Sequence, residues 1–180
     1  KLGLAAKGVL FAGNGVKELS GSADVDLGHG GLMKVDLKGG GLVAGGMAFE
    51  SLRIQADGDM GSHRLSASVK GEPLAVDLKA TGGLKEDNAY AGQLEGLDLS
   101  TREFGNWRLQ KAAPIAMAGA QISVGPVCIR EKAGSGGCVV FDQKAAGAWN
   151  ASLDLDRLAF DLFKNFVPEG LLLEGEALAK

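Results

Sequence analysis

The stretch "ELSGSADVDL", residues 18–27, alternates strictly between two kinds of side chain. Its odd positions are the small or apolar residues Leu19, Gly21, Ala23, Val25 and Leu27, whereas its even positions are all acidic or serine. Successive side chains of a β-strand point to opposite faces, so a period of two predicts a strand with one apolar and one solvated face. The stretch therefore indicates a sheet with one solvent-exposed face.

The same alternation recurs through the chain, in shorter runs at residues 33–38, 52–57, 74–79 and 149–156. Glycine-rich turns separate these runs at intervals of about 8–15 residues, which predicts on the order of a dozen antiparallel strands in a meander. Aromatic residues make up only 6% of the sequence. So few large rings fill a closed sandwich poorly, which favours an all-β sheet whose apolar face is left partly open as a groove.

One segment departs from the strand rhythm. In "DRLAFDLFKNFVPEG" the apolar residues from Ala159 to Phe166 fall at the i, i+3, i+4 and i+7 spacing of a helix face. Asp156 stands where an N-cap would lie, and Pro168 would end the helix. We expect one short amphipathic helix near residues 157–166.

Composition and motifs argue against an enzyme. The net charge is −3 with basic residues scattered singly, which gives no footprint for nucleic acid. The two histidines, His29 and His63, have no partners at metal-ligand spacing, and Ser135 in "AGSGG" lacks the first glycine of a nucleophile elbow. No phosphate-binding glycine motif is present. We expect no catalytic residue, no metal and no cofactor.

The longest uncharged run, residues 112–129, is interrupted by prolines and glycines. Two short strands joined by a turn explain this run better than a membrane helix does. The chain also begins and ends in the middle of an apolar pattern. We therefore expect residues 1–180 to be a single β-rich segment of a longer chain, with any anchor or targeting signal outside it.

The stretch "VCIREKAGSGGCVVF", residues 127–141, contains both cysteines, Cys128 and Cys138. If they face each other on a hairpin, the turn becomes a three-residue loop ending in Gly134, a common hairpin geometry. Nine intervening residues do not suit a CxxC redox motif, and zinc would require two more ligands. We predict a disulfide worth about 2–3 kcal/mol, with two free thiols as the alternative. A disulfide implies an oxidising compartment such as the bacterial periplasm.

The C-terminal half, from "YAGQLEGLDLSTREFGNWRLQ" through the cysteine hairpin to "FKNFVPEG", resembles the TamB family of AsmA-like proteins. The resemblance covers about the last ninety residues and rests on a set of positions in this order: Trp107 and Leu109, Cys128 and Cys138, Trp149, the apolar segment 160–166, and Pro168-Glu169-Gly170.

The resemblance implies a long periplasmic β-sheet curled like a taco around an apolar groove. It implies a full-length protein that is anchored in the inner membrane of a Gram-negative bacterium and partners an outer-membrane barrel of the TamA type. The implied role is phospholipid transport between the membranes, linked to outer-membrane protein assembly, with nascent outer-membrane proteins as further candidate partners.

With this resemblance, the residues at the apolar positions of each alternating run become candidates to line a lipid groove. An ordinary closed core is the alternative. Three phenylalanines of the expected helix are candidates to cover the groove, Phe160, Phe163 and Phe166. The candidate lining residues are Leu19, Val25, Leu27, Val35, Leu37, Leu52, Ile54, Leu65, Val69, Leu74, Val76, Leu78, Leu97, Leu99, Leu153 and Leu155.

Two other functions remain open from the sequence. One is a chaperone or scaffold module that offers its sheet edges to unfolded outer-membrane strands. The other is a passenger segment of a secreted adhesin, with a dry, closed β-solenoid core.

Overall fold

The computed structural model describes residues 1–26, 31–85, 88–145, 147–166 and 175–179. Within them lies one sheet of 13 strands and one short helix. The strands are β1 (Leu2–Phe11), β2 (Asn14–Asp26), β3 (Leu32–Ala44), β4 (Met47–Gly58), β5 (His63–Lys70), β6 (Leu74–Leu84), β7 (Tyr90–Thr101), β8 (Gly105–Leu109), β9 (Ala113–Ala118), β10 (Gln121–Glu131), β11 (Gly136–Gln143), β12 (Trp149–Ala159) and β13 (Glu176–Ala179).

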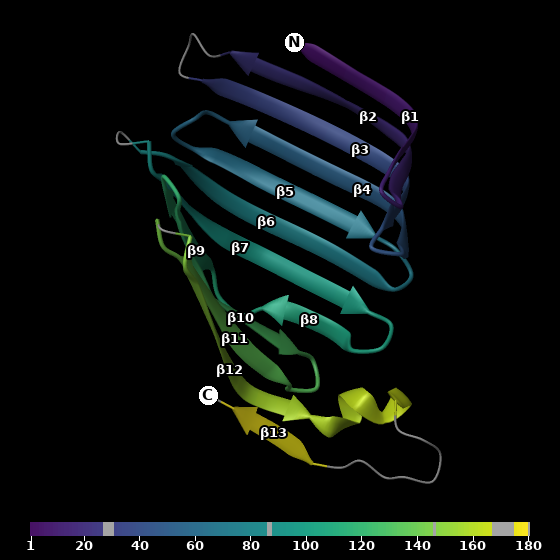
Figure 1. Cartoon of the computed structure of the whole chain (residues 1–180), viewed down its shortest axis with the longest axis vertical. Coiled ribbons are helices and arrows are strands. Elements are labelled where there is room, and N and C mark those ends of the chain that lie inside the picture. Colours follow the sequence, from purple (N-terminus) through teal and green to yellow (C-terminus); the bar gives the residue numbers. More distant parts are fainter. Residues whose placement is uncertain (27–30, 86–87, 146, 167–174, 180) are drawn as a thin grey trace.

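The strands pair in chain order, and every pair is antiparallel (Figure 1). The one exception to a simple meander is β8 and β9, which lie end to end between β7 and β10 and pair with both. The predicted all-β antiparallel sheet is confirmed. Each alternating run of the sequence lies in a strand, although Leu27, the last residue of the first run, is outside the described residues.

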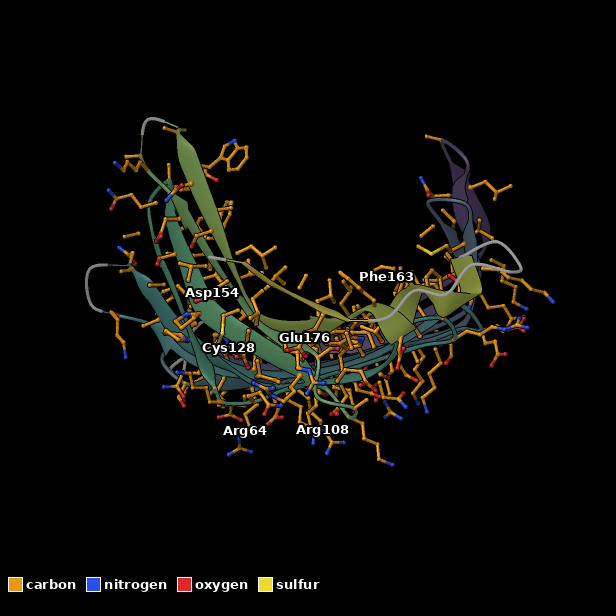
Figure 2. All side chains as sticks on the ribbon, turned by 90° about the horizontal axis from the view of Figure 1, so that it is seen from below. Arg64, Arg108, Cys128, Asp154, Phe163 and Glu176 are labelled. Carbon is orange, nitrogen blue, oxygen red and sulfur yellow. A yellow bond between two sulfur atoms is a disulfide. The ribbon has the colours of Figure 1, made fainter. Side chains whose placement is uncertain are left out.

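The sheet is curled into a trough. Seen end on, the ribbon forms a U, with Arg64 and Arg108 on its convex side (Figure 2). The chain exposes 12009 Å² of surface, whereas a compact monomer of its 18.4 kDa mass exposes roughly 8200 Å². A sheet that closed on itself would not leave half as much surface again in contact with solvent. The described residues therefore form an open layer.

One side of the trough is shaped by irregular pairing that runs across the sheet. Register shifts occur between β6 and β7 at Lys79/Ala80, between β10 and β11 at Gly125–Pro126, and between β11 and β12 at Gly136/Gly137. The first two shifts and the break between β8 and β9 lie in one band, whereas the third lies nearer the β10–β11 turn. Bulges bend strands and increase their twist. Aligned across neighbouring strands, they crease the sheet, and β9–β12 rise as a green wall in Figure 2.

The opposite wall is formed by the first strands, coloured purple in Figure 2. Pairing is interrupted where Gly8 of β1 and Gly41 of β3 adopt φ values of +62° and +61°. Glycine adopts this left-handed conformation without the steric penalty of a side chain. A Cβ placed on Gly39 would lie 3.2 Å from Leu42 Cδ1 and 3.6 Å from Val16 Cγ2, so these apolar side chains still turn toward the concave face beyond the bend.

The predicted helix is present but begins later and is of another type. A 3₁₀ helix, η1, spans Phe160–Phe166. Asp156 does not cap it, because Asp156 lies within β12 and pairs with Arg130. Pairing with β11 and β13 keeps the chain extended through Ala159, whose N–H donates to Ser135 Oγ at 3.0 Å. The predicted start at residue 157 and the predicted cap are therefore wrong, and Pro168 lies outside the described residues.

Two glycines give a test of this fold. A Cβ added at Gly83 in β6 would lie 1.9 Å from the carbonyl oxygen of Gly61, which belongs to the turn packed against that strand end. We predict that Gly83→Ala lowers the free energy of unfolding by about 2 kcal/mol, since backbone has to move. Gly3→Ala is the matched control, because nothing lies within 4 Å of its added Cβ. Urea unfolding of both variants measures the difference, and equal stabilities would contradict the packing of this turn.

Candidate functional site

The concave face of the trough is a continuous apolar surface, and the strand register shows how it is assembled. Residues that face each other in an antiparallel pair point to the same side of the sheet. One row of directly paired residues crosses eight strands: Ala6, Leu19, Gly39, Leu52, Val69, Val76, Leu99 and Trp107. A second row is Leu4, Gly21, Leu37, Ile54, Ala67, Leu78 and Leu97.

The register brings the predicted lining residues together. Of the sixteen, Leu27 is outside the described residues, and the other fifteen lie on the concave face. Leu153 and Leu155 reach this face from β12, where they pair with Val139 and Gly137 of the cysteine hairpin. Several of these side chains are open to solvent, with Leu153 54% and Val25 47% exposed. Nothing in the described part of the chain covers them.

The best-buried part of the face was missed by the sequence reasoning. Leu94, Leu109 and Ala113 form the core cluster at the crease, at 7%, 8% and 0% exposure. The register shift between β6 and β7 pairs Ala80 with Leu94 but Leu78 with Leu97, so strict alternation from Leu97 assigns Leu94 to the wrong face. In the sequence, the alternation of Ala113, Ile115 and Met117 indicates a strand with one apolar face. However, which face of β7 these residues share depends on the register shift between β6 and β7, which the sequence does not reveal.

Helix η1 lies at the side of the sheet where β7 and β12 end and β8 begins (Figure 1). Of the proposed covering residues, Phe163 packs edge-on against Phe104 of the β7–β8 turn, with ring centroids 6.1 Å apart. The backbone N–H of Phe160 donates to Gly175 O at 2.9 Å. The side chain of Phe166 is outside the described part. The helix is thus tied to the turn after β7 and to the start of the final strand.

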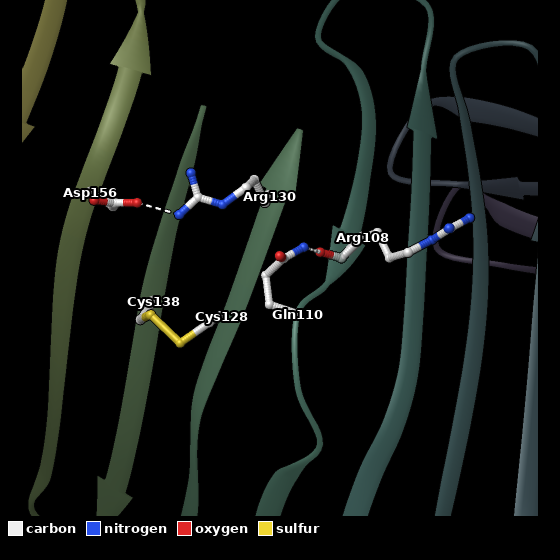
Figure 3. The surroundings of a disulfide bond; sticks show 6 residues. All are labelled: Arg108, Gln110, Cys128, Arg130, Cys138 and Asp156. Carbon is white, nitrogen blue, oxygen red and sulfur yellow. Dashed lines mark hydrogen bonds and ion pairs between the residues drawn. A yellow bond between two sulfur atoms is a disulfide. The ribbon is translucent and has the colours of Figure 1, made fainter. Parts of the chain in front are cut away.

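The convex face is polar, and several of its charges are paired. Arg53 contacts Asp36 at 3.2 Å and Arg108 contacts Asp98 at 2.5 Å. Arg130 reaches Asp156 across β11 (Figure 3). The hydrogen bond and the charge of Asp98 raise the pKa of the Arg108 guanidinium. Exposed pairs of this kind contribute little to stability. Their consequence is that the convex face stays hydrated while the concave face stays apolar.

The predicted disulfide between Cys128 and Cys138 is confirmed, with Cα atoms 4.0 Å apart. The predicted register is confirmed as well: Val127 pairs with Val139 and Ile129 with Gly137, so both sulfurs lie on the convex face. Gln110 connects the neighbouring strand, since its N–H donates to Cys128 O at 2.8 Å. The disulfide therefore lies outside the groove, beside the break between β8 and β9 (Figure 3).

The residues considered for other chemistry have structural partners. Ser135 is 1% exposed, and its hydroxyl accepts the N–H of Ala159. His63 lies on the concave face with its Nε2 3.2 Å from Tyr90 Oη, and His29 is outside the described residues. Across the described ranges, no group of three or more histidines, cysteines and carboxylates is placed to hold a metal ion. No helix in those ranges has the length and hydropathy to cross a membrane.

A single-layer trough, apolar inside, charged outside and fastened by a disulfide, defines a class of β-groove proteins. Comparison with protein families identifies which one: the model of the TamB N-terminal domain matches residues 1–180. The chain therefore belongs to the TamB family, and the match extends to the first ninety residues as well as to the half that carried the resemblance. No curated protein and no solved structure matches. TamB-family proteins function in the periplasm.

The disulfide provides a second test. We predict that the double variant Cys128→Ala/Cys138→Ala loses about 2–3 kcal/mol of unfolding free energy, because the open loop gains entropy in the unfolded chain. Urea unfolding with and without reductant measures this loss: reductant should destabilise the wild type and leave the double variant unchanged. Mass analysis of alkylated, nonreduced protein should show no free thiol, and two alkylated cysteines would contradict the disulfide.

Proposed function

We propose that this chain is part of a periplasmic conduit that shelters the acyl chains of phospholipids as they pass between the inner and outer membranes. The observation that carries the proposal is the uncovered concave face, which is apolar from β1 to β12. Soluble monomers rarely expose contiguous apolar surface on this scale, and where they do it marks a binding site. Membership of the TamB family supports lipid as the occupant.

The dimensions of the groove suit an acyl chain. The sheet stacks its strands in twelve successive positions, and at ~4.8 Å per strand the floor runs roughly 50 Å. One leaflet of a bilayer contributes about 15 Å of hydrocarbon, half of the ~30 Å core. Several acyl chains therefore fit end to end along the floor of the groove. The groove runs perpendicular to the strands, so lipids would cross from one strand to the next.

The mechanism is passive. Each CH₂ group removed from water is stabilised by about 0.8 kcal/mol, so a continuous apolar floor lowers the cost of carrying a lipid tail through an aqueous compartment. Polar headgroups remain at the open side of the trough. No catalytic step is required, and we propose that the chain is not an enzyme.

The cellular setting of the proposal follows from the family. The full-length protein would be anchored in the inner membrane, span the periplasm and meet a TamA-type barrel at the outer membrane. Nascent outer-membrane proteins are further candidate clients of this pathway. The confirmed disulfide supports an oxidising compartment.

A second function is favoured by the sheet edges. Among the described strands, β1 pairs only with β2 and β13 only with β12. An unpaired edge is a template for adding a strand, as a chaperone of outer-membrane proteins would require. The closed-solenoid alternative is less compatible with the open layer described above. The edge function predicts that clients bind without competing with lipid.

Charge placed on the groove floor tests the conduit. We predict that Ile54→Asp and Val76→Asp each abolish lipid co-purification and transport, since a carboxylate on the concave face forces water into the path of the acyl chain. Ser66→Asp is the control, because Ser66 lies on the convex face opposite Lys79 and Gln55. Native mass spectrometry of purified protein measures bound lipid, and circular dichroism checks the fold.

The outcomes separate the two functions. Loss of lipid in both floor variants and retention in Ser66→Asp support the conduit. A lipid-free wild type, or floor variants that carry and transport lipid normally, would reject it. Client binding that persists in the floor variants would favour the edge function instead.

A further inference from the structure

The concave face carries polar side chains at its margins, and a hydrogen-bonded pair of them lies where β5 begins, β6 ends and β7 begins. His63 and Tyr90 lie there, with Nε2 3.2 Å from Tyr90 Oη and ring centroids 5.5 Å apart. Between them is Gly82 of β6, in register with His63. A Cβ at Gly82 would lie 2.3 Å from Tyr90 Oη, so the phenol lies directly over this glycine on the concave side.

The imidazole is oriented from its other side. Its Nδ1 lies 3.2 Å from the backbone carbonyl oxygen of Asp59. A carbonyl only accepts hydrogen bonds, so Nδ1 carries a proton and donates it. Nε2 then faces the phenol, either accepting its O–H or, when the imidazole is protonated, donating to Oη. In the protonated state the Tyr90 O–H is free to donate to a third group.

The surroundings of the pair limit what that third group is. The next row inward is Leu65, Ala80 and Leu94, two of which are buried. On the neighbouring strand β9, Tyr90 pairs with Met117, which is 38% exposed. The pair thus lies at the boundary between the apolar floor and the solvated margin, where an amphipathic ring is well placed. A ligand here is apolar on one side and polar on the other.

We propose that His63 and Tyr90 bind the phosphate of a glycerophospholipid whose acyl chains lie on the adjoining apolar floor. The proposal rests on the lipid-conduit function and adds to it a headgroup site and the side of the trough from which headgroups emerge. Tyr90 Oη donates to a phosphate oxygen, and His63, having taken a proton from solvent, donates from Nε2 to Oη. The negative phosphate favours this protonated imidazole.

The residues paired with His63 on the neighbouring strands bring no charge to the imidazole. The residue opposite His63 on β4 is Gly58 and the one on β6 is Gly82, so neither brings a charge. The Asp59 carboxylate accepts the N–H groups of Gly61 and Ser62 within its own turn. Tyr90 Oη and the backbone carbonyl of Asp59 are the groups that the ring nitrogens contact.

The chain contains a single tyrosine, which gives a direct reporter. In protein labelled with 3-fluorotyrosine, Tyr90 is the only ¹⁹F resonance. The probes are dihexanoyl phosphatidylcholine, used below its micellar concentration, and dihexanoylglycerol, which has the same acyl chains without the phosphate. We expect both to bind the full chain, and only the phosphatidylcholine to shift the Tyr90 resonance through hydrogen bonding.

Three variants sharpen the test. Tyr90→Phe should weaken phosphatidylcholine binding about tenfold, the range for a hydrogen bond to a charged group, and leave dihexanoylglycerol binding unchanged. His63→Gln should weaken phosphatidylcholine binding several-fold and leave dihexanoylglycerol binding unchanged, because the imidazole that orients the Tyr90 hydroxyl is lost. Ser66→Ala, on the convex face, is the control and should affect neither ligand.

The results distinguish this site from the conduit as a whole. If both ligands bind the wild type and Tyr90→Phe with unchanged affinities, the conduit stands and the headgroup site is rejected. The site is also rejected if Tyr90→Phe weakens both ligands equally, because that indicates a packing role. If neither ligand binds the wild type, the conduit fails and the headgroup site fails with it.

Discussion

The antiparallel backbone ladder is the interaction on which the rest of this structure depends. Only five hydrophobic side chains are buried among the described residues: Phe49, Ala80, Leu94, Leu109 and Ala113. A globular domain of similar length relies on apolar burial for its cohesion. Here hydrogen bonds between neighbouring strands hold an extended layer together, and they also fix which side chains share a face. The apolar surface is therefore free to bind something other than the protein itself.

Curvature turns that layer into a groove. Bulges aligned across β6–β11 raise one wall, and the glycines Gly8 and Gly41 bend the first strands to form the other. The core cluster forms on the inside of the crease, where curvature brings Leu94 and Leu109 close enough to bury each other. The disulfide and the Arg130–Asp156 pair lie on the convex side of the same region. Rigidity is concentrated where the sheet departs most from a regular ladder.

The two faces divide the work between stability and binding. Charge pairs and the disulfide occupy the convex face, so nothing polar has to cross the groove to stabilise it. The hydrogen-bonded pair His63 and Tyr90 lies at the margin of the concave face, where the headgroup of a lipid on the floor would emerge. This arrangement suits a molecule that must move along the floor without strong anchoring, while its headgroup is recognised from one side.

The sequence by itself determined the strands, the one-sided alternation, the hairpin register around Cys128 and Cys138 and the family resemblance, because these depend on local periodicity and turn chemistry. Fifteen of the proposed lining residues could be assigned to one face for the same reason. Leu94, the start of η1 and the His63–Tyr90 pair were decided only by the tertiary structure. A bulge in β7 places Leu94 on the concave face, against the strict alternation. Pairing with β13 keeps β12 extended over residues that were expected to be helical. Gly82 has no side chain, so the Tyr90 ring can pass over β6 to reach His63. Each of these depends on a partner strand distant in sequence, which local pattern does not specify.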